Sequence, residues 1–247
     1  MIDFYYWPTP NGWKIAIALE EMGIPYTTHL MHIGKSDQFK PDFLKISPNN
    51  RMLAIVDHNG TDGAPRALFE SGAILQYLAR ETGKFYGATY RDQLAVDQWL
   101  MWQMSGLGPM AGQNHHFNKY APLMGENLTY AQDRYTQETA RLYRVLNTQL
   151  AQSDYVAGDF FSIADMAIWP WYGNLIAGNL YGDSATFLDT QSYTHVVRWQ
   201  QEIWQRPAVK RGRKVNRLAG KPSDQLHERH DASDFDLRTE DKLNPEG

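Results

Sequence analysis

The sequence contains no cysteine among its 247 residues. A chain without cysteine has no disulfide bond, no cysteine nucleophile and no thiolate ligand for a metal ion. If this protein carries out thiol chemistry, the thiol must therefore belong to a bound ligand.

Long apolar runs and an excess of positive charge are also missing. No stretch approaches the ~18 apolar residues of a membrane-spanning helix, and the formal net charge is -4. Such a charge gives no general attraction for nucleic acid or for an anionic membrane, so we expect neither as a partner. The first residues, MIDFYYWPTP, lack a basic segment followed by an apolar one, which favours a cytoplasmic location. The segment His227-Glu-Arg-His230 is one residue short of a zinc-binding H-E-x-x-H motif, and we expect no metal.

The first third of the chain alternates strand-like and helix-like patterns. Apolar periodicity and turn residues predict the order β-α-β-α-β-β-α. The segments are a strand at 2–6, a helix beginning at Asn11 and ending at Gly23, a strand at 25–33, a helical turn at 42–46, strands at 54–57 and 67–69, and a helix at 71–81.

Helical patterns rich in aromatic residues and methionine follow, over 91–105, 128–151, 162–178 and 192–205. The fold class is therefore α/β plus all-α. We predict an α/β domain over 1–86, an all-helical domain over 90–210 and a polar tail over 211–247. The tail has too little apolar surface to fold alone, so it is either disordered or laid across the body of the protein.

Two strand-to-helix junctions carry polar residues suited to ligand binding. At the first, Thr9 and Asn11 flank the start of a helix, where backbone N–H groups favour a bound anion, including a thiolate. At the second, Glu70 and Ser71 could bracket a ligand with both an ammonium and a carboxylate group. The alternative at both junctions is ordinary helix capping.

Three other polar or aromatic segments can be explained by structural roles rather than by ligand binding. Ser162 and Asp165 have the spacing of a capping box, which we interpret as structural. The segment Gln113 to Phe117 fits either a pocket wall or a hydrogen-bonded helix connection. The aromatic run Trp169 to Tyr172 is more typical of core packing than of a substrate pocket.

Taken together, several motifs resemble the nu-class bacterial glutathione transferases. They also resemble, more distantly, the related fungal nitrogen-regulator branch. The likeness covers nearly the whole chain, and the tail motif H-E-R-H-D-A-S-D-F is similar to one nu-class subgroup. The motifs are T-P-N-G, I-S-P-N-N, F-E-S-G-A-I, G-P-M-A-G-Q-N-H-H-F and S-I-A-D-M-A-I-W-P-W.

This resemblance implies a homodimer with a thioredoxin-like first domain that binds glutathione as a co-substrate. It implies that Thr9 and Asn11 lie nearest the glutathione sulfur, and that Glu70 and Ser71 hold the γ-glutamyl end. The remaining expected contacts with glutathione are Gln38, the Met52 backbone with Leu53, and Arg134, which acts within one subunit or across the dimer. The second-substrate pocket is expected to include His115 and Tyr172.

The implied reaction is attack of the glutathione thiolate on a disulfide or another electrophile. Helix N–H groups and small polar side chains can lower the pKa of a bound thiol, which agrees with the lack of cysteine in the chain. The expected activity is disulfide-bond reduction. Two alternatives stay open: removal of glutathione from aromatic thioethers, and a non-catalytic glutathione-binding regulator.

The sequence departs from the family at Leu53, where the family has a cis-proline that presents the preceding backbone to glutathione. A cis bond before leucine is far less favourable than one before proline. Either the Met52-Leu53 peptide is held cis, or it is trans and glutathione binding is weakened.

Overall fold

The computed structural model describes all of the chain except residues 61–62, 179, 216–227 and 238–247. His227 and much of the predicted tail therefore lie outside the described residues. Contacts divide the chain into two compact units. The first comprises Met1–Lys84 and the chain from Trp204 on, and the second comprises Phe85–Ile203.

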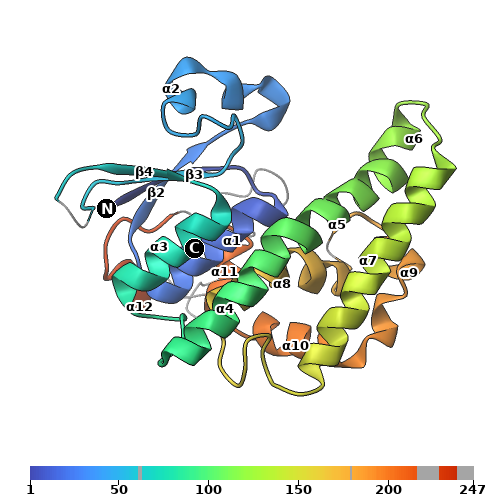
Figure 1. Ribbon diagram of the computed structural model, residues 1–247. Helices are drawn as coiled ribbons and strands as arrows, with labels where there is room; N and C mark the ends of the chain where they lie inside the picture. The colour runs from blue at the N-terminus through green and yellow to red at the C-terminus, as the bar shows by residue number, and fades with distance from the viewer. Residues whose placement is uncertain (61–62, 179, 216–227, 238–247) are drawn as a thin grey trace. The chain divides into compact units, whose positions relative to one another are not determined.

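The first unit contains a four-stranded sheet with strand order β2-β1-β3-β4 (Figure 1). β1 pairs parallel with β2 and antiparallel with β3, and β3 pairs antiparallel with β4. The predicted order β-α-β-α-β-β-α is confirmed. The elements are β1 Ile2–Tyr6, α1 Pro10–Met22, β2 Tyr26–Leu30, the short 3₁₀ turns η1 Ile33–Lys35 and η2 Asp37–Phe39, α2 Pro41–Leu44, β3 Ala54–Asp57, β4 Arg66–Phe69 and α3 Ser71–Thr82.

Helix α1 is the most buried element of this unit. It packs against α3 and against α11 (Pro207–Gly212) near the end of the described chain. The approach of α11 is close: a Cβ atom on Gly212 would lie 2.9 Å from the Cα of Ile17. Residues 204–210, expected in the helical domain, therefore belong with the first unit, because α11 covers a face of α1.

The second unit is helical, as predicted. Its helices α5 and α7 pack together, and α4 packs on α8 (Figure 1). The elements are α4 Tyr90–Trp102, the π-helical segment η3 Gln103–Leu107, α5 Gly108–His115, the π-helical segment η4 His116–Tyr120, α6 Ala121–Leu123, α7 Thr129–Leu150, α8 Ile163–Ile176, α9 Ser184–Phe187, the 3₁₀ turn η5 Thr190–Ser192 and α10 Thr194–Trp204. None of the helices in the described ranges is long and apolar enough to cross a membrane.

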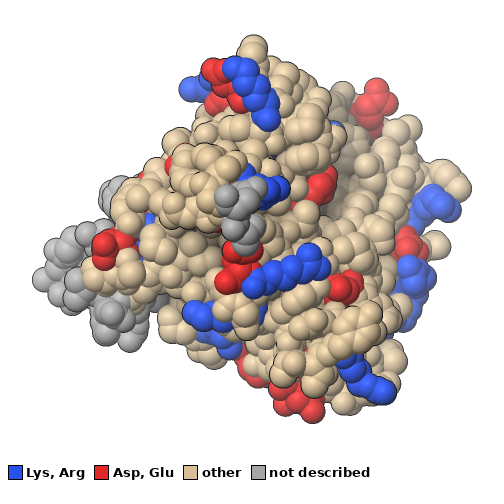
Figure 2. All heavy atoms as spheres, turned by 60° about the vertical axis from the view of Figure 1, so that its left-hand side comes forward, with Lys and Arg blue, Asp and Glu red and all other residues tan. Residues whose placement is uncertain are grey.

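The surface carries charges of both signs. On the face shown in Figure 2, lysine and arginine side chains lie among aspartate and glutamate side chains, without a broad patch of one sign. This distribution agrees with the small net charge of -4.

Helix α8 is the centre of the helical unit, because all fourteen of its residues are buried. Its first turn contains the predicted capping box, which is confirmed. The Asp165 carboxylate accepts hydrogen bonds from the backbone N–H of Ser162 (3.0 Å) and Val156 (3.0 Å) and from the Trp199 indole (2.9 Å). Asp165 thus connects the start of α8 with α10 and with the loop before α8. Burial raises the pKa of Asp165 to about 6.

The described part of the tail lies across the first unit, and two of its arginines meet the C-terminal end of α1. Glu20 Oε2 accepts from Arg229 Nε at 2.6 Å, and Glu20 Oε1 accepts from Arg211 Nε at 3.1 Å. The Tyr26 hydroxyl also donates to Glu20 Oε1, at 2.7 Å. Both guanidinium groups are buried. The tail then forms a short helix, α12 (Asp234–Leu237), with Phe235 beneath the Arg229 guanidinium.

We predict that Asp165→Asn lowers the free energy of unfolding by about 2–3 kcal/mol. The two carboxylate oxygens of Asp165 accept hydrogen bonds from several donors, whereas an asparagine side chain has only one acceptor oxygen. The variant therefore leaves a buried donor without a partner, which is costly. The matched control is Asp92→Asn, in the exposed capping box of α4 that Asp92 forms with Thr89. Urea unfolding of both variants measures the difference. An equal loss of unfolding free energy in the two variants would contradict the idea that burial makes the Asp165 hydrogen bonds more important.

We also predict that Glu20→Gln destabilises the protein by about 3–5 kcal/mol, because it removes a buried negative charge that pairs with two buried guanidinium groups. Its neighbour Glu21 pairs with Arg206, whose side chain is 32% exposed. The Glu21 side chain is 7% exposed and accepts two hydrogen bonds from Arg206, so Glu21→Gln should cost about 1–2 kcal/mol, less than Glu20→Gln. Urea unfolding midpoints of the two variants compare them directly, and a larger effect at Glu21 would refute this account.

Candidate functional site

Thr9 is the N-cap of α1 and lies next to Met52. Its side chain accepts from Gly12 N at 3.4 Å, and its hydroxyl donates to the Met52 sulfur at 4.0 Å. Gly12 leaves no room for a side chain, since an added Cβ would lie 2.2 Å from the Trp7 carbonyl oxygen. Asn11 occupies the first turn and is half-buried. The structure therefore brings together two predicted contacts, Thr9 and Met52, at a helix N-terminus.

The loop before β3 holds Met52 in place. The Ser47 hydroxyl donates to the Arg51 carbonyl oxygen at 2.9 Å, and Met52 packs on a small cluster of Met31, Phe43 and Ala54. The peptide bond between Met52 and the buried Leu53 is cis. This is the first of the two alternatives that the sequence left open.

Glu70 and Ser71 form the second junction, at the start of α3. The N-cap is Glu70, which makes no side-chain capping bond, and Ser71 is the first helical residue. The interpretation of Ser71 as a plain N-cap is therefore wrong. Glu70 has a φ of +70°, uncommon for a residue other than glycine and often found at functional sites. Its exposed carboxylate accepts from Asn49 Nδ2 at 3.4 Å.

Gln38 lies in η2, where its side-chain oxygen is buried without a hydrogen-bond partner among the described residues. The loop around it is fixed by Asp37, whose carboxylate accepts from His32 N at 2.9 Å. Buried polar atoms almost always have a partner, so an orphaned acceptor is a candidate contact for the N–H group of a ligand.

The first unit thus offers three kinds of ligand contact. The N-terminus of α1 with Thr9 suits an anion, Glu70 suits an ammonium group, and the N-terminus of α3 with Ser71 suits a carboxylate. Sequence reasoning missed Lys14, whose Nζ donates to Ser71 Oγ at 3.4 Å. The available signal was a lysine inside the apolar run W-K-I-A-I-A-L.

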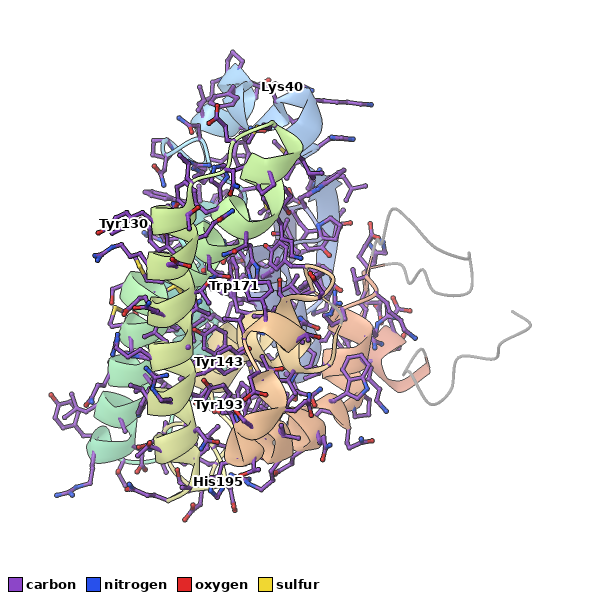
Figure 3. The ribbon with its side chains drawn as sticks, turned by 90° about the vertical axis from the view of Figure 1, so that its right-hand side faces the viewer. Lys40, Tyr130, Tyr143, Trp171, Tyr193 and His195 are labelled. Carbon is purple, nitrogen blue, oxygen red and sulfur yellow. The ribbon has the colours of Figure 1, made fainter. Side chains whose placement is uncertain are left out.

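In the helical unit, Tyr172 belongs to the core and not to an open pocket wall. Its side chain is fully buried, its ring stacks on Tyr143 at 3.8 Å, and its hydroxyl donates to the Thr139 carbonyl oxygen at 3.1 Å. Figure 3 shows Tyr143 close to Tyr193, which adds a second stacked ring at 5.0 Å. The core interpretation of the aromatic run is confirmed.

His115 is also fully buried. Its ring stacks on Tyr181 at 3.7 Å, and its Nδ1 lies 3.4 Å from the Ser184 hydroxyl. Burial, with a smaller contribution from the Lys119 charge, lowers the pKa of His115 to about 3, so the ring is neutral at pH 7. His115 Nδ1 thus fits a hydrogen-bonded helix connection, while its Nε2 is buried without a hydrogen-bond partner among the described residues, and its place in a second-substrate pocket stays a prediction.

Arg134 lies exposed on α7, where it lines a groove of about 750 Å³. The other residues that line this groove are Met110, Tyr130, Asp133, Tyr135, Gln137, Glu138, Arg141 and Arg144. Three arginines and Tyr130 make this a polar surface with aromatic edges. Among the described residues, there is no group of three or more histidines and carboxylates that could hold a metal ion.

Two family models match the chain. Residues 9–81 match "Glutathione S-transferase, N-terminal domain", and residues 96–207 match "Glutathione S-transferase, C-terminal domain". The sequence is 47% identical over 248 residues to the disulfide-bond oxidoreductase YghU of Escherichia coli (strain K12), covering 98% of this chain and 84% of that protein. It is 48% identical over 210 residues to the disulfide-bond oxidoreductase YfcG of the same strain, covering 85% and 93%.

A solved structure gives a comparable match. It is a glutathione transferase from Pseudomonas putida with one glutathione disulfide bound per subunit. The TM-score is 0.81 at 38% identity, and the match covers 89% of this chain and 92% of that one. The similarity therefore extends through both compact units.

Proposed function

Because the chain belongs to the glutathione S-transferase family, we propose that it is a glutathione-dependent disulfide-bond reductase. The observation that carries the proposal is the Thr9 hydroxyl at the N-terminus of α1, beside Met52. The chain has no cysteine of its own, so the reacting thiol is that of glutathione. The two Escherichia coli relatives named disulfide-bond oxidoreductases support the reaction type.

Glutathione fits the ligand contacts of the first unit. Its γ-glutamyl ammonium group pairs with Glu70, and its α-carboxylate accepts from the Ser71 hydroxyl and from N–H groups of α3. The cysteinyl part lies against the Met52 backbone, and the orphaned Gln38 oxygen accepts from an N–H group of the tripeptide. Arg134 reaches a glutathione carboxylate, within one subunit or across a dimer.

The reaction is thiol–disulfide exchange. The helix N-terminus and the Thr9 and Asn11 side chains stabilise the glutathione thiolate, which attacks one sulfur of a disulfide. The disulfide bond breaks, a glutathione mixed disulfide forms, and the leaving thiolate takes up a proton. A second glutathione thiolate then attacks the mixed disulfide, which yields glutathione disulfide and the second free thiol.

We further propose a homodimer formed through α4 and α7. Helix α4 exposes Tyr90, Leu94 and Met101, with exposed fractions of 74%, 50% and 47%. Tyr130, near the start of α7, is 78% exposed and projects away from the helix (Figure 3). Several large apolar side chains exposed along one helix are typical of an interaction face. Most soluble oligomers place such a face on a two-fold axis.

We predict that Thr9→Val lowers kcat/KM for the glutathione-dependent reduction of hydroxyethyl disulfide by about 10–100-fold, because the thiolate loses a hydrogen bond that stabilises its charge. Thr9→Ser is the matched control, since it keeps the hydroxyl and the cap. Coupling to glutathione reductase follows the turnover, and thiolate absorbance follows the pKa of bound glutathione.

Circular dichroism shows whether each Thr9 variant folds. Full activity of a folded Thr9→Val protein would contradict the role of the hydroxyl. A folded wild-type protein that binds glutathione but reduces no small disulfide would identify the chain as a non-catalytic glutathione-binding protein.

For the dimer, we predict that the double variant Leu94→Glu/Met101→Glu sediments as a monomer, because it places four charges at the two-fold interface. The control is Phe187→Glu on α9, where the phenylalanine is 38% exposed and lies outside the proposed face. Analytical ultracentrifugation distinguishes the two. A dimer that persists in the double variant would exclude α4 as the interface.

A further inference from the structure

Met52 lies next to Thr9 in the proposed glutathione site. The Thr9 hydroxyl donates to the Met52 sulfur at 4.0 Å, and the same oxygen accepts from Gly12 N at 3.4 Å. A hydroxyl group has only one proton to donate. The proton that is proposed to stabilise the glutathione thiolate is therefore directed at the Met52 sulfur in this structure.

The Met52 sulfur is easily displaced from Thr9 while it remains a thioether. A thioether sulfur is a weak hydrogen-bond acceptor. A thiolate anion forms a charge-assisted hydrogen bond, which is roughly twice as strong as a neutral one. Glutathione can therefore take the Thr9 hydrogen bond from Met52, whereas a stronger acceptor on the Met52 side chain would retain it.

Oxidation of the sulfur creates such an acceptor. The Met52 sulfur attacks one oxygen of hydrogen peroxide, the O–O bond breaks and hydroxide leaves. The hydroxide then removes the proton from the oxygen on the sulfur, which gives water and methionine sulfoxide. The sulfur loses two electrons and the peroxide gains them. The polar sulfoxide oxygen accepts a hydrogen bond far better than the thioether sulfur does.

The distance between the two side chains suits this new hydrogen bond. An O–H···O hydrogen bond is about 2.7 Å long. The 4.0 Å between Thr9 Oγ1 and the Met52 sulfur is longer than this, which leaves room for an oxygen bonded to the sulfur. The Met52 side chain also packs on the cluster of Met31, Phe43 and Ala54, so its sulfoxide stays close to Thr9.

Met52 is also among the methionines that peroxide can reach. The chain has nine methionines and no cysteine, so methionine is the residue that mild peroxide oxidises. Met52 is half-buried, while Met22, Met31 and Met166 are buried. Susceptibility to oxidation follows exposure, so Met52 should react before these three.

From this geometry we propose that Met52 is an oxidation site that controls the activity of the proposed reductase. Its sulfoxide holds the Thr9 hydroxyl away from the glutathione thiolate, and methionine sulfoxide reductases restore the original side chain. The inference rests on the proposed function, because it takes the Thr9 hydroxyl as a donor to the thiolate. The Met52 side chain acts on the thiolate through Thr9 and takes no part in the exchange reaction itself.

The test compares the protein before and after treatment with hydrogen peroxide, which catalase removes before the assay. Peptide mass spectrometry gives the oxidised fraction of each methionine, and the coupled assay gives kcat/KM for hydroxyethyl disulfide with glutathione. We expect complete oxidation of Met52 to lower kcat/KM by about 10–100-fold, the loss predicted for Thr9→Val. Activity should recover after treatment with the two methionine sulfoxide reductases, one for each epimer.

Three variants, each compared with its own untreated sample, separate Met52 from the other methionines. Met52→Leu has no sulfur at this position, so peroxide should not change its kcat/KM. The matched control is Met124→Leu, which removes a methionine that is 65% exposed in the other compact unit and should keep the full loss. In Thr9→Val there is no hydroxyl to capture, so peroxide should lower kcat/KM by about twofold or less.

Oxidation of Met52 without a loss of activity would overturn the inference and leave the proposed function intact. The same holds if Met52 stays reduced while Met124 is oxidised, or if Met52→Leu or Thr9→Val loses as much activity as the wild type. A circular dichroism signal lost on treatment would overturn it too, because oxidation would then act through unfolding. An untreated protein that binds glutathione but reduces no disulfide would remove both the inference and the proposed function.

Discussion

Helix α1 has eleven of its thirteen residues buried, so each polar group on it needs a partner inside the protein. Three such groups follow one another along the helix. The N-terminus with Thr9 faces the proposed thiol, Lys14 in the second turn meets Ser71, and Glu20 near the end binds two arginines of the C-terminal segment. The partners of these groups come from α3, from α11 and from the tail. Burial of one helix therefore determines where three distant parts of the chain must lie.

The proposed chemistry is based on the absence of cysteine and on the position of Thr9. Proteins with a thioredoxin-like fold commonly use cysteine at this helix N-terminus, whereas this chain places a hydroxyl and a helix dipole there. The same features that would stabilise a protein thiolate can stabilise the thiolate of a bound ligand. Within the described part of the tail, Arg213 lies over Trp13 near the start of α1, and Arg229 binds Glu20 about 15 Å along the helix from Pro10.

Local sequence signals predicted the elements well because those signals act over a few residues. Turn residues and apolar periodicity identified both junctions, and the Ser162 and Asp165 spacing identified a capping box that the structure confirms. The contacts that depend on distant parts of the chain were beyond such signals. Lys14 and Ser71 are 57 residues apart, and Glu20 and Arg211 are 191 residues apart.

The sequence misjudged Tyr172 for a related reason. A hydroxyl on an aromatic ring looks suited to a substrate pocket, but only the packed structure shows that the Thr139 carbonyl oxygen already accepts from it. Contacts place residues 204–210 with the first unit, although the family model of the C-terminal domain extends to residue 207; the helical pattern of these residues carries no information about the neighbour they cover, which is α1.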